Sequence, residues 1–180
     1  MTTALLVIDI QRGAFDGVRC PPIDSPERLV GHANRLVDAA RAGQRPIVFI
    51  QHCESDPEAP FEEGSVHGQL HPSLVPGGEQ EITLKKYASS AFENTDLDAQ
   101  LKALLVHELI VCGRQSEFCV SNTARSALAL GYRVQIAQDA HSTWPSGGRS
   151  AAAIRDEVNS TLAAAGAVLA STADLSTHAA

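Results

Sequence analysis

The stretch LIVCGRQSEFCVSNTARSALALGYRVQIAQDAHST, residues 109–143, decides the expected fold. It opens with the continuous apolar run Leu109–Cys112, which is typical of a strand buried on both faces of a parallel sheet. A helical pattern follows from about Cys119 to Leu130, and Gly131 supplies the usual helix stop. A weaker apolar run at 134–137 completes a strand–helix–strand unit. Such a unit sets its two strands parallel to each other.

The same alternation recurs on both sides of this stretch. Runs of strand character occur at residues 5–8, 47–50, 82–86 and 167–170, with helical patterns between most of them. Glycines at positions 43, 131 and 166 each separate a helical pattern from the strand that follows. We therefore expect one α/β domain over residues 1–180, built on a doubly wound, mostly parallel sheet of five or six strands.

Two segments fall outside this alternation. Residues 53–81 hold four of the nine prolines and four of the thirteen glycines, which predicts a long irregular loop. Loops of that length in compact domains usually serve a function. Residues 172–180 read as a loosely held tail.

Composition narrows the class of protein. The net charge of −7 and the absence of a Lys/Arg-rich run argue against a nucleic-acid surface or an anionic membrane as partner. No run approaches the roughly 20 apolar residues of a membrane span, and the N-terminus does not resemble a signal peptide. The four cysteines form no CxxC pair, so we expect reduced thiols in a cytoplasmic protein.

The residues suited to chemistry lie where strands end. Ligands of open α/β sheets bind beyond the carboxyl ends of the strands. Asp9 directly follows the run at 5–8, where it could transfer protons or merely order a loop. Cys119 falls in the first turn of the predicted helix, whose free N–H groups should lower the thiol pKa, although most such cysteines are inert. Of Lys85 and Lys86 only one can face the cleft, and both could be plain surface lysines.

Other candidates carry less information. We interpret His52, His67 and His71 chiefly as structural, although His52 ends a strand and could contact substrate. No metal or cofactor is expected, and no G-x-S-x-G nucleophile elbow occurs. The candidate pocket residues are Phe15, His52, Arg114 and Trp144.

Three blocks of sequence together resemble the isochorismatase-like hydrolase family. They are ALLVIDIQRGAF at 4–15, LKKYASSAFENTDLDAQL at 84–101 and the stretch at 109–143. The resemblance implies a three-layer, Rossmann-like α/β fold and an Asp–Lys–Cys triad, which maps onto Asp9, Lys86 and Cys119. Lys86 is chosen over Lys85 because the family lysine usually precedes the phenylalanine, here Phe92, by six positions. The family also implies a cis peptide bond at Arg114–Gln115 and an oxyanion hole made by the N–H groups of Gln115 and Cys119.

Two departures from the family pattern limit this carry-over. The metal-binding Asp-x-His of the nicotinamidase branch is replaced by Ile50-Gln51-His52, which argues against a metal-dependent nicotinamidase. The turn Arg-Gln-Ser-Glu-Phe stands where many relatives have small or apolar residues.

We expect a cysteine hydrolase that cleaves a C–N bond of a small amide through a thioester. One alternative is isochorismatase-type hydrolysis of a vinyl ether, which needs no thiol. Another is a non-catalytic binding protein on the same fold. The resemblance also implies a homo-oligomer.

Overall fold

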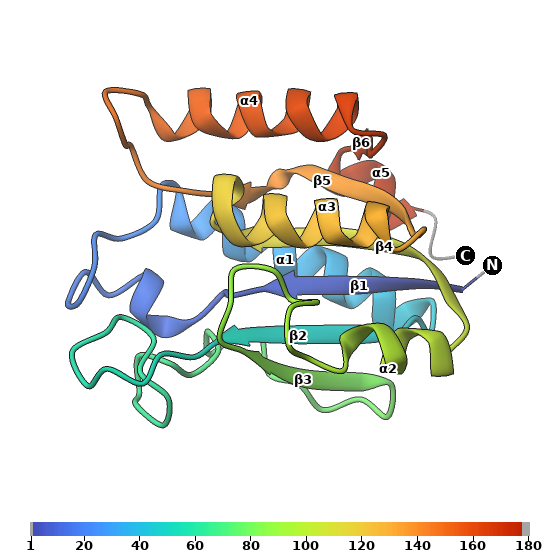
Figure 1. The fold of residues 1–180 in the computed structure, drawn as a ribbon, viewed down its shortest axis with the longest axis horizontal. Coiled ribbons are helices and arrows are strands. Elements are labelled where there is room, and N and C mark those ends of the chain that lie inside the picture. The colour runs from blue at the N-terminus through green and yellow to red at the C-terminus, as the bar shows by residue number, and fades with distance from the viewer. Residues whose placement is uncertain (1, 178–180) are drawn as a thin grey trace.

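The computed structural model describes residues 2–177 and contains one six-stranded sheet in which all paired strands are parallel. The strand order is β3-β2-β1-β4-β5-β6, as Figure 1 shows. This confirms the predicted α/β class and the parallel sheet. The strands are β1 (Thr2–Ile8), β2 (Ile47–His52), β3 (Glu81–Lys86), β4 (Val106–Arg114), β5 (Arg133–Ser142) and β6 (Val168–Ala170).

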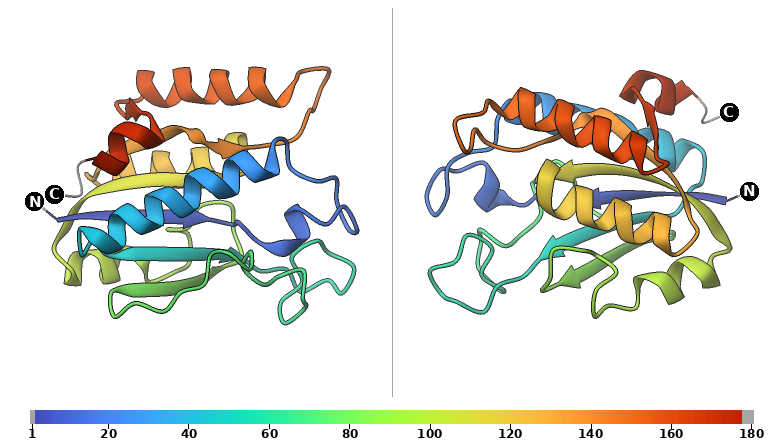
Figure 2. Two further views of the ribbon diagram at one scale, coloured as in Figure 1. Left: turned by 180° about the vertical axis from the view of Figure 1, so that it is seen from behind. Right: turned by 45° about the horizontal axis from the view of Figure 1, so that its top comes forward.

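Helices cover both faces of the sheet and give the molecule three layers (Figure 2). The α-helices are α1 (Pro26–Ala42), α2 (Leu97–Ala103), α3 (Ser121–Ala129), α4 (Ala151–Ala164) and α5 (Thr172–Thr177). α2, α3 and α4 pack on one face, while α1 and α5 pack on the other. The described chain also contains two short helical turns, the 3₁₀ turn η1 (Arg12–Ala14) and the π-helical turn η2 (Ser116–Val120). None of the described helices is long and apolar enough to cross a membrane.

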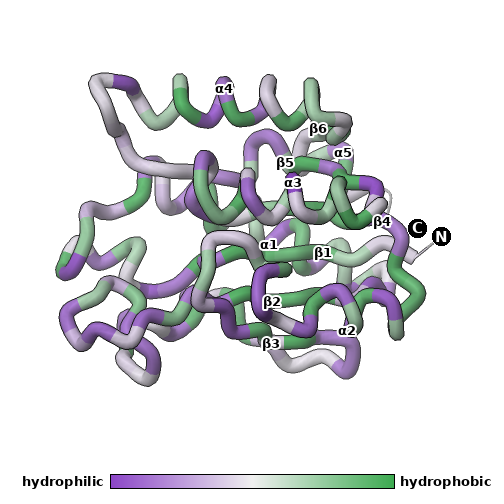
Figure 3. The backbone as a smooth tube through the Cα atoms, viewed as in Figure 1, coloured by the Kyte–Doolittle hydropathy of each residue, from purple (hydrophilic) through white to green (hydrophobic). Residues whose placement is uncertain are grey.

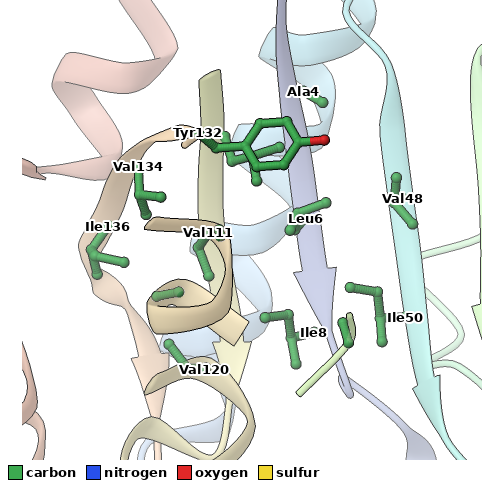
Figure 4. Close-up of a cluster of buried hydrophobic side chains, with 14 of the residues drawn as sticks. Ala4, Leu6, Ile8, Val48, Ile50, Val111, Val120, Tyr132, Val134 and Ile136 are labelled. Atoms are coloured by element: carbon green, nitrogen blue, oxygen red, sulfur yellow. The ribbon is translucent and has the colours of Figure 1, made fainter. Parts of the chain in front are cut away.

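The central strand β1 is apolar on both sides because it lies between two cores. Ala4, Leu6 and Ile8 enter the core under α2, α3 and α4, which Figure 4 shows, while Leu5 and Val7 enter the core under α1. Figure 3 shows the hydrophobic residues gathered on the strands. Full burial of each such aliphatic side chain contributes about 1.5–3 kcal/mol.

The sheet reverses its strand order between β1 and β4, and the carboxyl ends of these two strands lie close together. β1, β2 and β3 extend to one side of this point, and β4, β5 and β6 to the other. Gly113 has φ +129, and a Cβ there would lie 2.1 Å from the Ile8 carbonyl oxygen. Only glycine allows this approach, so Gly113 fixes how closely the ends of β1 and β4 meet.

Two details differ from expectation. The prediction of a loose tail at 172–180 is wrong for residues 172–177, which form α5; residues 178–180 lie outside the described part. Thr172 bonds Asp139 through both its N–H and its hydroxyl, and the buried Leu175 packs in the α1 core. Cys119 lies in η2, just before α3, and not in the first turn of an α-helix.

Candidate active site

The buried ammonium of Lys86 is the centre of the candidate site. Lys86 ends β3, is fully buried, and places Nζ 2.8 Å from Asp9 Oδ2. Because β2 separates β3 from β1, the lysine side chain crosses the end of β2 to reach Asp9. Lys85 faces away and pairs with Glu63 at the surface, 2.7 Å from Nζ to Oε1. The structure thus confirms that only one of the two lysines faces the site, and that it is Lys86.

The thiol of Cys119 contacts the same ammonium. Lys86 Nζ lies 3.3 Å from Cys119 Sγ, and the hydroxyl of Ser89 lies 3.9 Å from it. Cys119 is partly exposed, in contrast to the fully buried Cys112 in β4. The structure therefore brings together the carboxylate, the ammonium and the thiol that the sequence singled out.

The protonation state of Cys119 differs from the sequence-based expectation. Burial, together with the nearby Asp9 carboxylate, raises the pKa of this thiol to about 11, although Lys86 acts in the opposite direction. The expectation of a lowered pKa is wrong because desolvation outweighs any help from helix N–H groups. At neutral pH the resting site holds a thiol, which needs a base before it can attack.

Asp9 keeps one carboxylate oxygen free. Its backbone has φ +52, and its N–H donates to the Ile50 carbonyl, which fixes the residue just beyond β1. Oδ2 pairs with Lys86, whereas Oδ1 is buried and has no hydrogen-bond partner among the described residues. The Asp9 carboxylate also acts on the Cys119 thiol, whose pKa it raises, so it is near enough to accept the thiol proton.

His52 belongs to the same cluster. Lys86 Nζ donates to His52 Nδ1 at 3.2 Å, so Nδ1 carries no proton in this arrangement. Burial and the neighbouring ammonium lower the His52 pKa, which keeps the ring neutral. Gln11 Nε2 donates to the His52 carbonyl, and Gln11 Oε1 accepts from the His52 N–H, at 2.9 Å each. His52 therefore lies in contact with Lys86, and its role as a pocket residue stays a prediction.

Arg114 and Trp144 meet at the end of β4. The Arg114 guanidinium lies 4.6 Å from the ring centre of Phe61 and 5.5 Å from that of Trp144. Arg114 is only 3% exposed, and it is close enough to Asp9 and Cys119 for their charges to act on it. Two further predicted pocket residues are therefore next to the cluster.

Three aromatic or imidazole side chains lie elsewhere. Phe15 packs edge-on against His71, with ring centres 4.9 Å apart, and contacts none of the three central side chains. His67 pairs with Asp16 at 2.6 Å, and His71 Nδ1 bonds the Ser73 hydroxyl. Phe15 thus lies apart from the Asp9, Lys86 and Cys119 side chains, and its role as a pocket residue stays a prediction. In the part of the chain it describes, no cluster of three or more His, Cys, Asp or Glu has a metal-binding arrangement.

The turn that carries Cys119 begins at a cis peptide bond between Arg114 and Gln115, as the resemblance implied. The N–H groups of Phe118 and Val120, on either side of Cys119, both donate to the Gln115 carbonyl, at 3.2 and 3.1 Å. These bonds fold the turn back on Gln115. The N–H groups of Gln115 and Cys119 thereby belong to one tight loop.

The buried side chain of His141 supports the turn that carries Cys119. His141 Nδ1 bonds the Ser116 hydroxyl at 2.8 Å, and Nε2 bonds Asn159 Oδ1 at 2.9 Å. Since an amide oxygen only accepts, Nε2 carries the proton and Nδ1 accepts from Ser116. Burial lowers the His141 pKa to about 4, so the ring is neutral at physiological pH.

The match to a family of known proteins agrees with this geometry. The family model for the isochorismatase domain matches residues 3–174. The chain belongs to the isochorismatase family. It is therefore an isochorismatase-family hydrolase, and Asp9, Lys86 and Cys119 all lie within the matched range.

Individual members of the isochorismatase family match over most of this chain. The uncharacterized isochorismatase family protein YddQ of Bacillus subtilis (strain 168) is 37% identical over 144 residues, which are 79% of each chain. Streptothricin hydrolase of Streptomyces noursei is 36% identical over 78% of this chain but over only 50% of its own length. The crystal structure of an isochorismatase from Pseudomonas putida KT2440 superposes with a TM-score of 0.87 at 33% identity, covering 96% of this chain and 89% of that one.

Several residues of the site were missed by the sequence analysis. Gln11 clamps His52, Phe61 contacts Arg114, and Ser116, His141 and Asn159 fix the nucleophile turn. For most of these residues the sequence gives no signal, because their contacts join segments far apart in the chain. Gln11 could have been found, since a polar residue two positions past Asp9 faces the same sheet edge.

Proposed function

We propose that this member of the isochorismatase family hydrolyses a C–N bond of a small amide or related carbonyl compound through a thioester on Cys119. The observation that carries the proposal is the position of Lys86 Nζ, 2.8 Å from Asp9 Oδ2 and 3.3 Å from Cys119 Sγ. One cation thus holds a base and a nucleophile side by side, which is the arrangement that nucleophilic catalysis requires. The scheme needs no cofactor, because side chains supply both groups.

The first half of the reaction forms the thioester. As Sγ attacks the carbonyl carbon, the Cys119 proton passes to the free Oδ1 of Asp9 and the carbonyl electrons move onto oxygen. The N–H groups of Gln115 and Cys119 are the proposed donors to that oxyanion. When the carbonyl re-forms, the C–N bond breaks and Asp9 returns its proton to the leaving nitrogen.

The second half of the reaction releases the acid. Water gives a proton to Asp9 and adds to the thioester carbon. The C–S bond then breaks, and the proton returns from Asp9 to the sulfur. The net change is one amide and one water converted to one acid and one amine, with the enzyme restored.

The raised pKa of Cys119 supports this assignment of roles. A thiol with a pKa of about 11 is almost entirely protonated at pH 7, so attack and proton removal must be coupled. Asp9 is the carboxylate that acts on this thiol, and its Oδ1 has no hydrogen-bond partner among the described residues. Lys86 holds Asp9 in place and favours the thiolate as it forms, since it lowers the Cys119 pKa.

The test is the loss of turnover in Cys119→Ala. A panel of primary amides, N-carbamoyl compounds and ureides is screened by ammonia release, and the best substrate is measured with each variant. We expect Cys119→Ala to lose at least about 10³-fold in kcat/KM. The matched variant Cys53→Ala should stay within a few-fold, since Cys53 meets Lys86 only through a backbone hydrogen bond, and its thiol bonds the Gln51 carbonyl instead of the Lys86 ammonium. Retained amide or vinyl ether hydrolysis in Cys119→Ala contradicts the proposal.

A further inference from the structure

The guanidinium of Arg114 is a buried cation without a direct ion-pair partner among the described residues. Arg114 is 3% exposed, yet its guanidinium has neither an ion pair nor a hydrogen bond with any other described residue. Its Nε is fully buried and unpartnered. A buried charge is costly unless it is paired, and unpaired buried donors are rare in folded proteins.

The nearby carboxylates do not supply that partner. Asp9 gives Oδ2 to Lys86, and Glu117 Oε1 accepts a hydrogen bond from the Thr143 hydroxyl at 2.9 Å. The second oxygen of each carboxylate, Asp9 Oδ1 and Glu117 Oε2, is buried and bonds no described residue, Arg114 included. Both act on Arg114 only through space. Burial lowers the Arg114 pKa, in the direction expected for a cation held away from water. The Arg114 guanidinium therefore remains without a direct hydrogen-bond acceptor from the described part of the chain.

Two aromatic rings lie against this cation. Phe61, from the long loop between β2 and β3, and Trp144, after β5, both lie within cation–π distance of it. Such rings stabilise a guanidinium but accept no hydrogen bonds along its N–H edge. That edge suits a planar group with two oxygens, because a carboxylate matches the guanidinium fork.

We propose that Arg114 binds a carboxylate of the substrate, so that the preferred substrates are small amides that also carry a carboxylate, such as ω-amido acids and N-carbamoyl amino acids. This inference rests on the proposed amide hydrolysis and narrows its substrate class. The carboxylate pairs with Arg114 while the amide carbonyl lies at Cys119 Sγ. A neutral substrate of the same shape leaves the arginine unpaired and binds poorly.

The activity test uses acids and amides of equal shape. Malonamate, succinamate and glutaramate are compared with malonamide, succinamide and glutaramide, so that chain length is varied as well. We expect the wild type to prefer the best carboxylate by at least about 100-fold in kcat/KM. Arg114→Met should lose this preference by weakening only the carboxylate reactions, Arg114→Lys should retain part of it, and the surface variant Arg133→Met should retain all of it. An unchanged preference in Arg114→Met, or none in the wild type, overturns the inference.

A second readout does not depend on turnover. Alkylation of Cys119 by iodoacetamide at pH 9 is followed by peptide mass spectrometry in the presence of succinate or succinamide. We expect succinate to slow alkylation in the wild type but not in Arg114→Met, and succinamide to slow it in neither. If succinate protects while no amide is cleaved, Arg114 binds anions and the proposed hydrolysis is what fails. Equal effects of succinate and succinamide overturn the inference, and a thermal unfolding curve for Arg114→Met shows whether it is folded.

Discussion

The single ammonium of Lys86 contacts several hydrogen-bond acceptors. Its Nζ lies within hydrogen-bond distance of Asp9, His52, the Ala88 carbonyl and the Cys119 sulfur, at 2.8–3.3 Å. An ammonium has only three protons, so the sulfur competes with better acceptors. This competition is consistent with a sulfur that is a neutral thiol at rest. Lys86 stabilises negative charge on the sulfur only as the thiol loses its proton.

Removing the Lys86 charge should cost both activity and stability. Lys86→Met leaves the buried Asp9 carboxylate unpaired, and breaking a buried ion pair costs about 3–5 kcal/mol. Lys85→Met breaks only the exposed pair with Glu63, which is worth about 1 kcal/mol or less. Urea unfolding at pH 7 compares the two variants. Equal losses in both would show that the buried pair has no special weight.

At the scale of single residues, the sequence predicted which residues form the candidate site better than it predicted their protonation and charge pairing. Asp9, Lys86 and Cys119 could be named because each follows or ends an apolar run within a recognisable block. The sign of the Cys119 pKa shift could not, because it depends on how much of the sulfur the fold buries. The unpaired charge of Arg114 is likewise a property of neighbours contributed by the loop between β2 and β3 and by the end of β5.

Among the elements, the junction of β1 and β4 depends on one glycine. Gly113→Ala places a methyl group 2.1 Å from the Ile8 carbonyl oxygen at φ +129, so we expect a loss of at least about 3 kcal/mol in the free energy of unfolding. Gly31→Ala is the matched control, since Gly31 lies in α1 with open space around it and should gain about 0.5–1 kcal/mol. Denaturant unfolding measures both. A harmless Gly113→Ala would contradict the close approach of the two strands.

The turn η2 should weaken as pH falls because it leans on a neutral histidine. The His141 pKa is about 4 in the folded chain and about 6.5 when unfolded, so the unfolded chain takes up the proton first. Stability from this group is complete above pH 6.5 and falls by about 2–3 kcal/mol on going to pH 4.5.

The histidine variants separate this effect from general acid unfolding. His141→Asn should be less stable at pH 7 and should lose less between pH 7 and 4.5 than the wild type does. His107→Asn changes an exposed histidine and should follow the wild type. Urea unfolding at both pH values gives the difference. If the free energy of unfolding depends on pH in the same way in the wild type and in His141→Asn, the His141 ring is not a buried neutral group that resists protonation.

The sequence predicted the regular elements well and their junctions poorly. Strands such as Leu5–Ile8 and helix ends such as Gly131 follow from apolar periodicity and from a glycine at positive φ. The helix α5 was missed because it is short and is held by tertiary bonds from Thr172 to Asp139. The π-helical form of η2 was missed for the same reason, since its support comes from His141 in β5.

At the scale of the whole molecule, the parallel sheet is what gathers the site. Asp9, His52, Lys86 and Arg114 lie at the carboxyl ends of β1, β2, β3 and β4, and Cys119 follows directly after β4. The long loops 9–25 and 53–80 leave the same edge (Figure 1). The fold could be predicted because the chain repeats one strand–helix unit. The surroundings of Arg114 could not, since Phe61 comes from the irregular loop between β2 and β3.

The most direct test of the central claim is to identify the atom that becomes acylated. The p-nitrophenyl ester of the acid released from the best amide makes acylation fast, so that an acyl-enzyme accumulates before an acid quench. Intact-mass and peptide analysis should show one acyl group, located on Cys119 in the wild type and absent from Cys119→Ala. An acyl group on another residue, or equal labelling of Cys119→Ala, would contradict a thioester mechanism at this site.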